Sequence, residues 1–247
     1  MHDAGQSYSL NDMEYNALIQ TVQKKRAVIF DLYHTLTALE SSWGGGRPLT
    51  AHMLGIDRAV WDKMLIETSR DRLVGKITDP LEIVGGMARR IDPSITDEVI
   101  KAATDNRVAK MAAAVISIPE ENQQLLRAIK EREQKLGLIS NADVTEMAGW
   151  KHSPIAPLFD SVVFSCEVGW VKPEREIYEI SLRQLGVRAD EAVFVGDGGS
   201  NELAGAREIG MITVMVTGIM QDMWPERIEE RRHQADFVIE RLGEMVG

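Results

Sequence analysis

Six short runs of apolar residues, spread from residue 27 to residue 239, constrain the fold of this chain most strongly. They cover residues 27–30, 135–140, 161–165, 192–197, 212–216 and 236–239. Apolar residues follow one another in these runs rather than alternating with polar ones, which is typical of strands buried on both faces of a parallel sheet. A helical pattern at 119–133 precedes the run at 135–140. Another at 173–185 lies between the runs at 161–165 and 192–197, and Gly186 ends it. The sequence therefore predicts an α/β protein with a doubly wound, Rossmann-like parallel sheet.

The segment between the first two runs breaks this alternation. It carries helical patterns at 57–68, 80–90 and 96–114 and no convincing strand. We therefore predict a small all-helical domain at 40–117, inserted into a core made of 26–39 and 118–247. The glycine-rich residues 41–46 (SSWGGG) are expected to form its flexible entry. Residues 1–25 are interpreted as an N-terminal extension without a catalytic role.

Composition narrows the range of partners. The formal net charge of −10 disfavours nucleic acid, which needs a basic footprint, and an anionic membrane surface. A small anionic substrate stays compatible with this charge, provided that its site carries local positive charge.

Cysteine content and targeting signals bear on location. The single cysteine, Cys166, excludes an internal disulfide, which suits a reducing compartment. Acidic and polar residues interrupt the first 14 positions, so no signal peptide is expected. The longest apolar stretch, 211–220, is too short for a membrane helix and is interpreted as a buried strand with its exit turn. We expect a cytoplasmic protein.

Polar residues of a consistent kind follow four of the predicted strands. Asp31 and Asp197 end two of them, Ser140 and Asn141 end another, and Lys172 comes shortly after a fourth. Ligands of parallel α/β sheets bind beyond the carboxyl ends of the strands, so these side chains should converge. Together they offer an attacking carboxylate, groups that hold anionic oxygens, a cation, and a second carboxylate for a metal ion.

The same residues carry a specific resemblance to a known family. The four stretches are 30–36 (FDLYHTL), 138–141 (LISN), 172–174 (KPE) with Ile177 and Tyr178 after it, and 195–211 (VGDGGSNELAGAREIGM). In this order they resemble the four motifs of the haloacid dehalogenase superfamily, in its subfamily with a helical cap. The resemblance covers nearly all of residues 26–247.

This resemblance implies a catalytic mechanism. Asp31 would be the nucleophile of a covalent intermediate, which splits hydrolysis into two easier steps. Lys172 would stabilise the charge that develops. Ser140 and Asn141 would contact phosphoryl or carboxylate oxygens, and Thr35, grouped with these substrate-binding residues, would support the loop that carries the nucleophile.

The resemblance also implies a magnesium ion. Asp31 and Asp197 would bind Mg²⁺ directly, with the backbone carbonyl of Tyr33 as the third protein ligand. Glu202 stands where the family often has aspartate. Because glutamate is one methylene longer, we expect it to act through a water molecule, which Mg²⁺ commonly retains.

The first motif departs from the phosphatase pattern at two positions. Most phosphatases of the superfamily have a second aspartate where this chain has Tyr33, whereas true 2-haloacid dehalogenases carry tyrosine there and need no metal. Asp197 and Glu202 argue for a metal, because clustered carboxylates repel unless a cation intervenes. The sequence thus favours a phosphatase, with a metal-independent dehalogenase as the alternative. One hypothesis is that Tyr33 or His34 supplies the proton to the leaving group. The other is that the leaving group is already good, so that Tyr33 and His34, which stands where glycine is common, mainly pack against the insert.

Two further expectations concern the rest of the chain. A non-catalytic binding protein on this fold is disfavoured, because Asp31, Lys172 and Asp197 are all present. The helical insert is expected to close over the site and to select the substrate. The candidate anion contacts there are Arg47, Arg70, Arg72 and Lys76, although residues of this kind are more often solvated surface charges. Trp43 is expected to be a packing residue.

Overall fold

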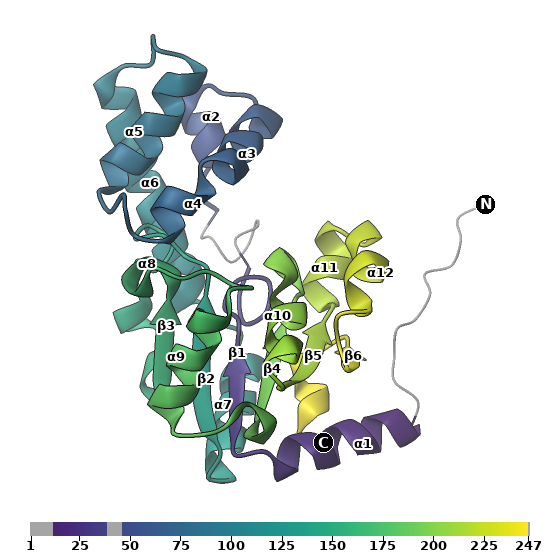
Figure 1. Cartoon of the computed structure of the whole chain (residues 1–247). Coiled ribbons are helices and arrows are strands. Elements are labelled where there is room, and N and C mark those ends of the chain that lie inside the picture. Colours follow the sequence, from purple (N-terminus) through teal and green to yellow (C-terminus); the bar gives the residue numbers. More distant parts are fainter. Residues whose placement is uncertain (1–11, 39–45, 247) are drawn as a thin grey trace, which may run out of the picture.

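The computed structural model describes residues 12–38 and 46–246, and it contains one six-stranded, all-parallel sheet (Figure 1). The strand order is β3-β2-β1-β4-β5-β6. The strands are β1 (Ala27–Phe30), β2 (Lys135–Ser140), β3 (Ser161–Phe164), β4 (Ala192–Gly196), β5 (Ile212–Val216) and β6 (Phe237–Ile239). Each lies within one of the six predicted runs, so the predicted α/β class is confirmed.

The sheet is covered on both faces, as the continuous apolar runs predict. Alternate residues of β1 pack into two different apolar clusters, one on each face of the sheet. Val28 and Phe30 pack on the first face, and Ala27 and Ile29 pack on the second. Helix α7 (Glu120–Glu131) covers the first face and α9 (Arg175–Leu185) the second. Two-sided burial explains why these strands read as unbroken apolar runs.

The remaining helices of this core lie at its N-terminal end and near the strand ends. Helix α1 (Asp12–Lys24) buries Leu18 and Val22 against the first face. The others are α8 (Ser165–Val168), α10 (Glu202–Glu208), α11 (Gly218–Met223) and α12 (Glu226–Arg232), with 3₁₀ turns at Trp150–His152, Ala156–Leu158, Ala189–Glu191, Gly199–Asn201 and Leu242–Met245. Helix α11 stands where an exit turn after β5 was predicted. It begins at Gly218, inside the apolar stretch 211–220, and its six residues are too few to show a clear helical periodicity.

Five helices form the insert beyond the carboxyl end of the sheet (Figure 1). They are α2 (Thr50–Leu54), α3 (Arg58–Glu67), α4 (Ser69–Leu73), α5 (Pro80–Ile91) and α6 (Asp97–Ile116). They enclose a separate apolar core, with Trp61, Val84 and Ala103 among its buried residues. The predicted inserted helical domain is thus present, while its exact limits stay a prediction. Trp43 and the glycine-rich entry up to residue 45 lie outside the described residues.

The helices of the insert begin where capping chemistry places them. The Asp57 side chain accepts hydrogen bonds from the backbone of Ala59 and Val60 at the start of α3. At the start of α5, the Asp79 side chain accepts one from Leu81, and Pro80 occupies the first turn. Both arrangements satisfy amide groups that lack a partner inside the helix.

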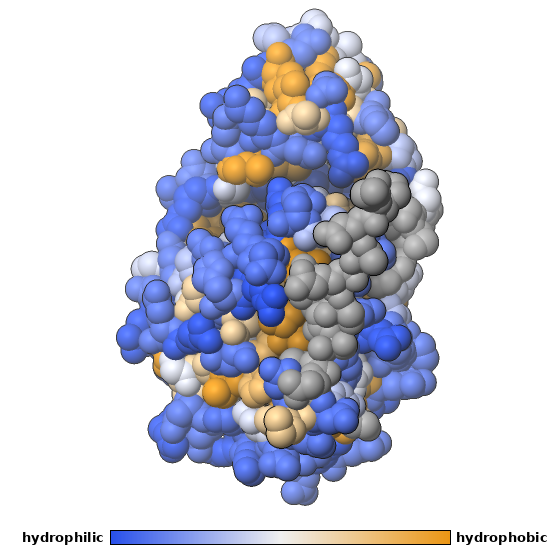
Figure 2. All heavy atoms as spheres, turned by 90° about the vertical axis from the view of Figure 1, so that its right-hand side faces the viewer, coloured by the Kyte–Doolittle hydropathy of each residue, from blue (hydrophilic) through white to orange (hydrophobic). Residues whose placement is uncertain are grey.

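The surface of the molecule is mainly hydrophilic on the face that Figure 2 presents, and hydrophobic side chains gather towards the far end of the insert. Exposed apolar residues of the insert include Val60, Ile66 and Leu81. Within the described part of the chain, no helix combines the length and the apolar character that crossing a bilayer requires.

Candidate active site

The site lies where the strand order reverses. The chain leaves β1 for β2 and β3 on one side, then returns to β4 on the other side of β1. Because Phe30 pairs with Val195 across these neighbouring strands, Asp31 and Asp197 end up at the same edge of the sheet. The Asp31 amide donates to the Val195 carbonyl at 2.9 Å. Such a switch point is the usual ligand crevice of an open parallel sheet.

Lys172 is buried at the centre of this site. Its ammonium group forms ion pairs with the carboxylates of Asp31 and Glu202 and donates to the Ile139 carbonyl at 3.0 Å. Burial alone would lower the pKa of Lys172, but the two carboxylates together raise it above the ordinary lysine value. The lysine is therefore a charged ammonium held against the predicted nucleophile, as expected of a group that stabilises negative charge.

Asn141 holds the backbone of this lysine. The Asn141 side chain accepts from the Lys172 amide at 2.7 Å and donates to the Lys172 carbonyl at 3.0 Å. These two bonds tie the end of β2 to the segment after α8. Asn141 thus positions Lys172 in this structure, in addition to lining the cavity, whereas Ser140 lies buried at the end of β2 and lines the cavity.

Three carboxylates converge in a way that suits a divalent cation. Ligand oxygens of Asp31, Asp197 and Glu202 all lie within 4.8 Å of one another, and all three residues are buried. Glu202 approaches so closely that a Cβ atom on Gly196 would lie 2.1 Å from its Oε1 atom, which accounts for glycine at that position. Oxygen ligands of this kind are those that Mg²⁺ prefers, so the residues present fit a magnesium ion.

Asp197 has a cationic partner that the sequence did not suggest. The Arg231 guanidinium, from α12, donates to the Asp197 carboxylate at 2.6 Å and to its backbone carbonyl at 3.3 Å. The Gly199 amide donates to the other carboxylate oxygen at 2.9 Å. These bonds hold the buried Asp197 carboxylate in a fixed orientation.

The loop after β1 places its side chains in different directions. The Thr35 hydroxyl donates to the Asp31 carboxylate at 3.3 Å. The Tyr33 hydroxyl instead donates to the backbone carbonyl of Glu146, and burial together with Glu146 raises the pKa of Tyr33 well above its usual value near 10. His34 has a left-handed backbone (φ 64°) and packs edge-on against Trp224, with ring centroids 4.8 Å apart.

A cavity of about 380 Å³ joins these groups. Most of the predicted site residues line it, namely Asp31, Tyr33, Ser140, Asn141, Lys172, Asp197 and Glu202, whereas Thr35 does not. Sequence reasoning missed Glu146, Trp224, Arg227 and Arg231, which also line it. The last three follow β5 in the sequence, and their position after a strand end was the signal that could have indicated them.

The four candidate anion contacts of the insert do not line this cavity. Arg47 is exposed, Arg70 pairs with Glu174 and Lys76 pairs with Asp71. Arg72 is buried, with 7% of its surface exposed, and forms an ion pair with Asp143 of the core at 2.6 Å. These four positions therefore supply surface charges and a structural ion pair.

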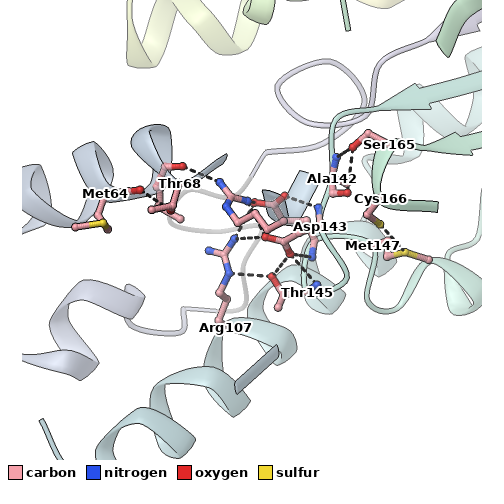
Figure 3. A network of polar contacts seen from close by, with 12 residues as sticks. Met64, Thr68, Arg107, Ala142, Asp143, Thr145, Met147, Ser165 and Cys166 are labelled. Atoms are coloured by element: carbon pink, nitrogen blue, oxygen red, sulfur yellow. Dashed lines mark hydrogen bonds and ion pairs between the residues drawn. The ribbon is translucent and has the colours of Figure 1, made fainter. Parts of the chain in front are cut away.

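A buried polar network that includes Arg107, Asp143 and Thr145 joins the insert to the core (Figure 3). Arg72 pairs with Asp143 in this network. Arg107 of α6 contributes a second guanidinium, which binds Glu146 at 2.7 Å and the Thr145 hydroxyl at 2.9 Å. Burial acts to raise the pKa of Asp143, but Arg107 and Arg72 hold it below the ordinary aspartate value. Since Glu146 lines the cavity and accepts from Tyr33, the network fixes one wall of the site from the side of the insert.

We expect the Arg72→Met variant to lose about 3–5 kcal/mol of unfolding free energy, because Asp143 would stay buried without its nearest cation. The measurement is the shift of the urea unfolding midpoint, followed by circular dichroism. The control is Arg127→Met, which removes an exposed pair with Glu120 and should cost about 1 kcal/mol or less. Equal, small shifts in both variants would contradict the structural role of the network.

Known proteins with similar sequences are hydrolases and phosphatases. A family model described as haloacid dehalogenase-like hydrolase matches residues 25–210. A glyceraldehyde 3-phosphate phosphatase from Methanocaldococcus jannaschii is 30% identical over 169 residues, which are 67% of this chain and 68% of that protein. One from Methanopyrus kandleri is 31% identical over 157 residues, or 63% of this chain and 64% of the relative.

Solved structures share the fold. L-2-haloacid dehalogenase from Xanthobacter autotrophicus superposes with a TM-score of 0.62 at 18% identity, covering 90% of this chain and 97% of that one. A haloacid dehalogenase family enzyme from Bacteroides thetaiotaomicron, in complex with magnesium and inorganic phosphate, gives 0.54 at 20% identity, covering 77% and 93%. With the family model matching well over half of its length, this chain belongs to the haloacid dehalogenase-like hydrolases.

Proposed function

We propose that this protein is a magnesium-dependent phosphatase that hydrolyses a small phosphate ester through an aspartyl-phosphate on Asp31. The observation that carries the proposal is the group of three buried carboxylates, Asp31, Asp197 and Glu202, with Lys172 against the first and third. A dehalogenase that works without metal has no evident use for the second and third carboxylates. The named phosphatase activity of the two archaeal relatives supports the same reading.

In the first step a carboxylate oxygen of Asp31 attacks phosphorus, and the bond from phosphorus to the ester oxygen breaks. Lys172, close to that carboxylate, stabilises the charge on the transferring phosphoryl group. The Ser140 hydroxyl is placed at a neighbouring strand end to donate to a phosphoryl oxygen. In the second step water attacks the same phosphorus, which releases inorganic phosphate and restores the Asp31 carboxylate.

The residues that would hold Mg²⁺ are Asp31, Asp197 and the backbone carbonyl of Tyr33, with Glu202 acting through water. Bound there, the ion would neutralise charge between the nucleophile and the phosphoryl oxygens. Glu202 supports this outer role, because its two carboxylate oxygens already accept from Lys172 and from the Gly198 amide.

Proton supply to the leaving group is the step in which this site differs from most phosphatases of the superfamily. The Tyr33 hydroxyl is engaged with the Glu146 carbonyl, and its raised pKa makes it a poorly matched acid near neutral pH. We therefore propose a substrate whose leaving group scarcely needs protonation, such as an acyl, aryl or anomeric phosphate.

The Tyr33→Phe variant should keep its rate on an aryl phosphate within about threefold, because the lost hydroxyl bond contributes to stability, on the order of 1 kcal/mol, rather than to proton transfer. The measurement is kcat on p-nitrophenyl phosphate in wild type, Tyr33→Phe and His34→Ala. A steep loss in Tyr33→Phe, with an unchanged circular dichroism spectrum, would instead assign acid catalysis to the tyrosine.

The experiment that tests the proposed function is a substrate screen. Wild-type protein is incubated with aryl, acyl, anomeric and alkyl phosphates and with 2-haloacids, in the presence of Mg²⁺. Release of phosphate, strongest from the activated esters, supports the proposal. Release of halide with no release of phosphate would replace it with the dehalogenase alternative.

A further inference from the structure

Part of the cavity wall comes from the segment after β5, whereas no described residue of the insert lines the cavity. Trp224, at the end of α11, and Arg227 and Arg231, in α12, line the same 380 Å³ cavity as Asp31. Small-molecule sites have volumes of about 300–1,000 Å³. The cavity therefore has room for the part of a substrate that lies beyond the reacting phosphoryl group, and that part would meet this wall.

The cations that line the cavity differ in whether a carboxylate pairs with them. Lys172 is paired with Asp31 and Glu202, and Arg231 is paired with Asp197. Arg227 makes no ion pair within residues 12–38 and 46–246; its guanidinium lies 5.6 Å from the centroid of the Trp224 ring. Among the cavity-lining cations of the described chain, its charge is the one that no carboxylate balances.

Trp224 connects this cation to the nucleophile loop. Its ring meets the His34 ring edge-on, with an interplanar angle of 86°, and His34 follows Asp31 by three residues. The Arg227 amide donates to the Trp224 carbonyl at 3.0 Å, so the arginine belongs to the turn that the tryptophan begins. An aromatic face orients a guanidinium without consuming its hydrogen-bond donors. Arg227 is solvent-exposed where it lines the cavity, and its donors are available to a ligand there.

We propose that Arg227, oriented by Trp224, binds a second anionic group of the substrate, a carboxylate or a further phosphate, and so selects among phosphate esters. The proposal rests on the phosphatase function proposed above and adds a substrate class to it. A guanidinium suits this task because its planar donors match the two oxygens of a carboxylate or phosphate. Selection would thus come from the core, in addition to any contribution of the insert.

The test compares aryl phosphates that differ by one carboxylate. Phenyl phosphate and its meta- and para-carboxy derivatives are assayed with Mg²⁺ in wild type, Arg227→Gln and Arg227→Lys. We expect wild type to favour at least one carboxy derivative by about tenfold or more in kcat/KM, mainly through KM, as a charge-assisted hydrogen bond would give. Arg227→Gln should reduce that preference to about twofold or less, and Arg227→Lys should retain part of it.

The matched control is Arg183→Gln, an exposed arginine of α9 outside the cavity, which should keep the wild-type preference. An active wild type with no preference, or a preference that survives in Arg227→Gln, would overturn the role of Arg227 and leave the phosphatase function standing. Absence of phosphate release from all esters in wild type would overturn the proposed function itself.

Discussion

The Asp31→Asn variant is expected to lose about a thousandfold or more in kcat on p-nitrophenyl phosphate, because an amide cannot form the covalent intermediate. Asparagine has the shape of aspartate, and the amide of residue 31 would still donate to the Val195 carbonyl. Lys172 would keep Glu202 as its counter-ion. The fold should therefore survive, which circular dichroism and the urea midpoint would verify.

The control for this loss is Asp105→Asn, which removes a carboxylate from the exposed face of α6, where it pairs with Lys101. This variant should retain wild-type turnover. Loss of the nucleophile should cost far more than about tenfold in kcat. If Asp31→Asn kept more than about a tenth of the wild-type kcat, Asp31 would not be the nucleophile and the proposed mechanism would be wrong.

Removal of divalent metal is expected to bring phosphatase turnover down to background. Asp31, Asp197 and Glu202 place three carboxylates within 4.8 Å of one another, and Lys172 and Arg231 together balance only part of their charge. Without a further cation, their repulsion towards a phosphate dianion would oppose binding and attack. The measurement is kcat after treatment with excess chelator and after re-addition of Mg²⁺, which should restore it.

A companion variant makes this experiment specific. Asp197→Asn should require a higher Mg²⁺ concentration for half-maximal rate, by about tenfold or more if one direct carboxylate ligand is lost. Full turnover of wild type in excess chelator would show that the reaction does not need a metal ion. The metal-independent dehalogenase would then be the leading alternative.

The parts of this molecule that sequence could predict are those that depend on local pattern. The strands around Ile29 and Phe194 were evident because both faces of a central parallel strand are buried, which leaves an unbroken apolar run. The convergence of Asp31 and Asp197 followed from strand-end position, since parallel strands present their carboxyl ends to one edge. Lys172 fitted the same logic and lies against Asp31.

The parts that sequence missed depend on contacts between distant residues. Arg72 looked like a surface charge, yet it pairs with Asp143, 71 positions away, in a buried network. The Tyr33 hydroxyl finds its acceptor at Glu146, 113 positions away. Helices α11 and α12 are too short for a clear periodicity. Arg231 could therefore be connected to Asp197 only once the chain was folded.

Detection of the covalent intermediate would test directly whether Asp31 is the nucleophile. Wild type is mixed with p-nitrophenyl phosphate and Mg²⁺, quenched in acid within the first turnovers, and digested for mass spectrometry. We expect a peptide that contains Asp31 and carries the added mass of one phosphoryl group. This mass should be lost on treatment with hydroxylamine and absent from Asp31→Asn. Rapid turnover with no phosphoryl group on that peptide, or a phosphoryl group on another residue, would contradict it.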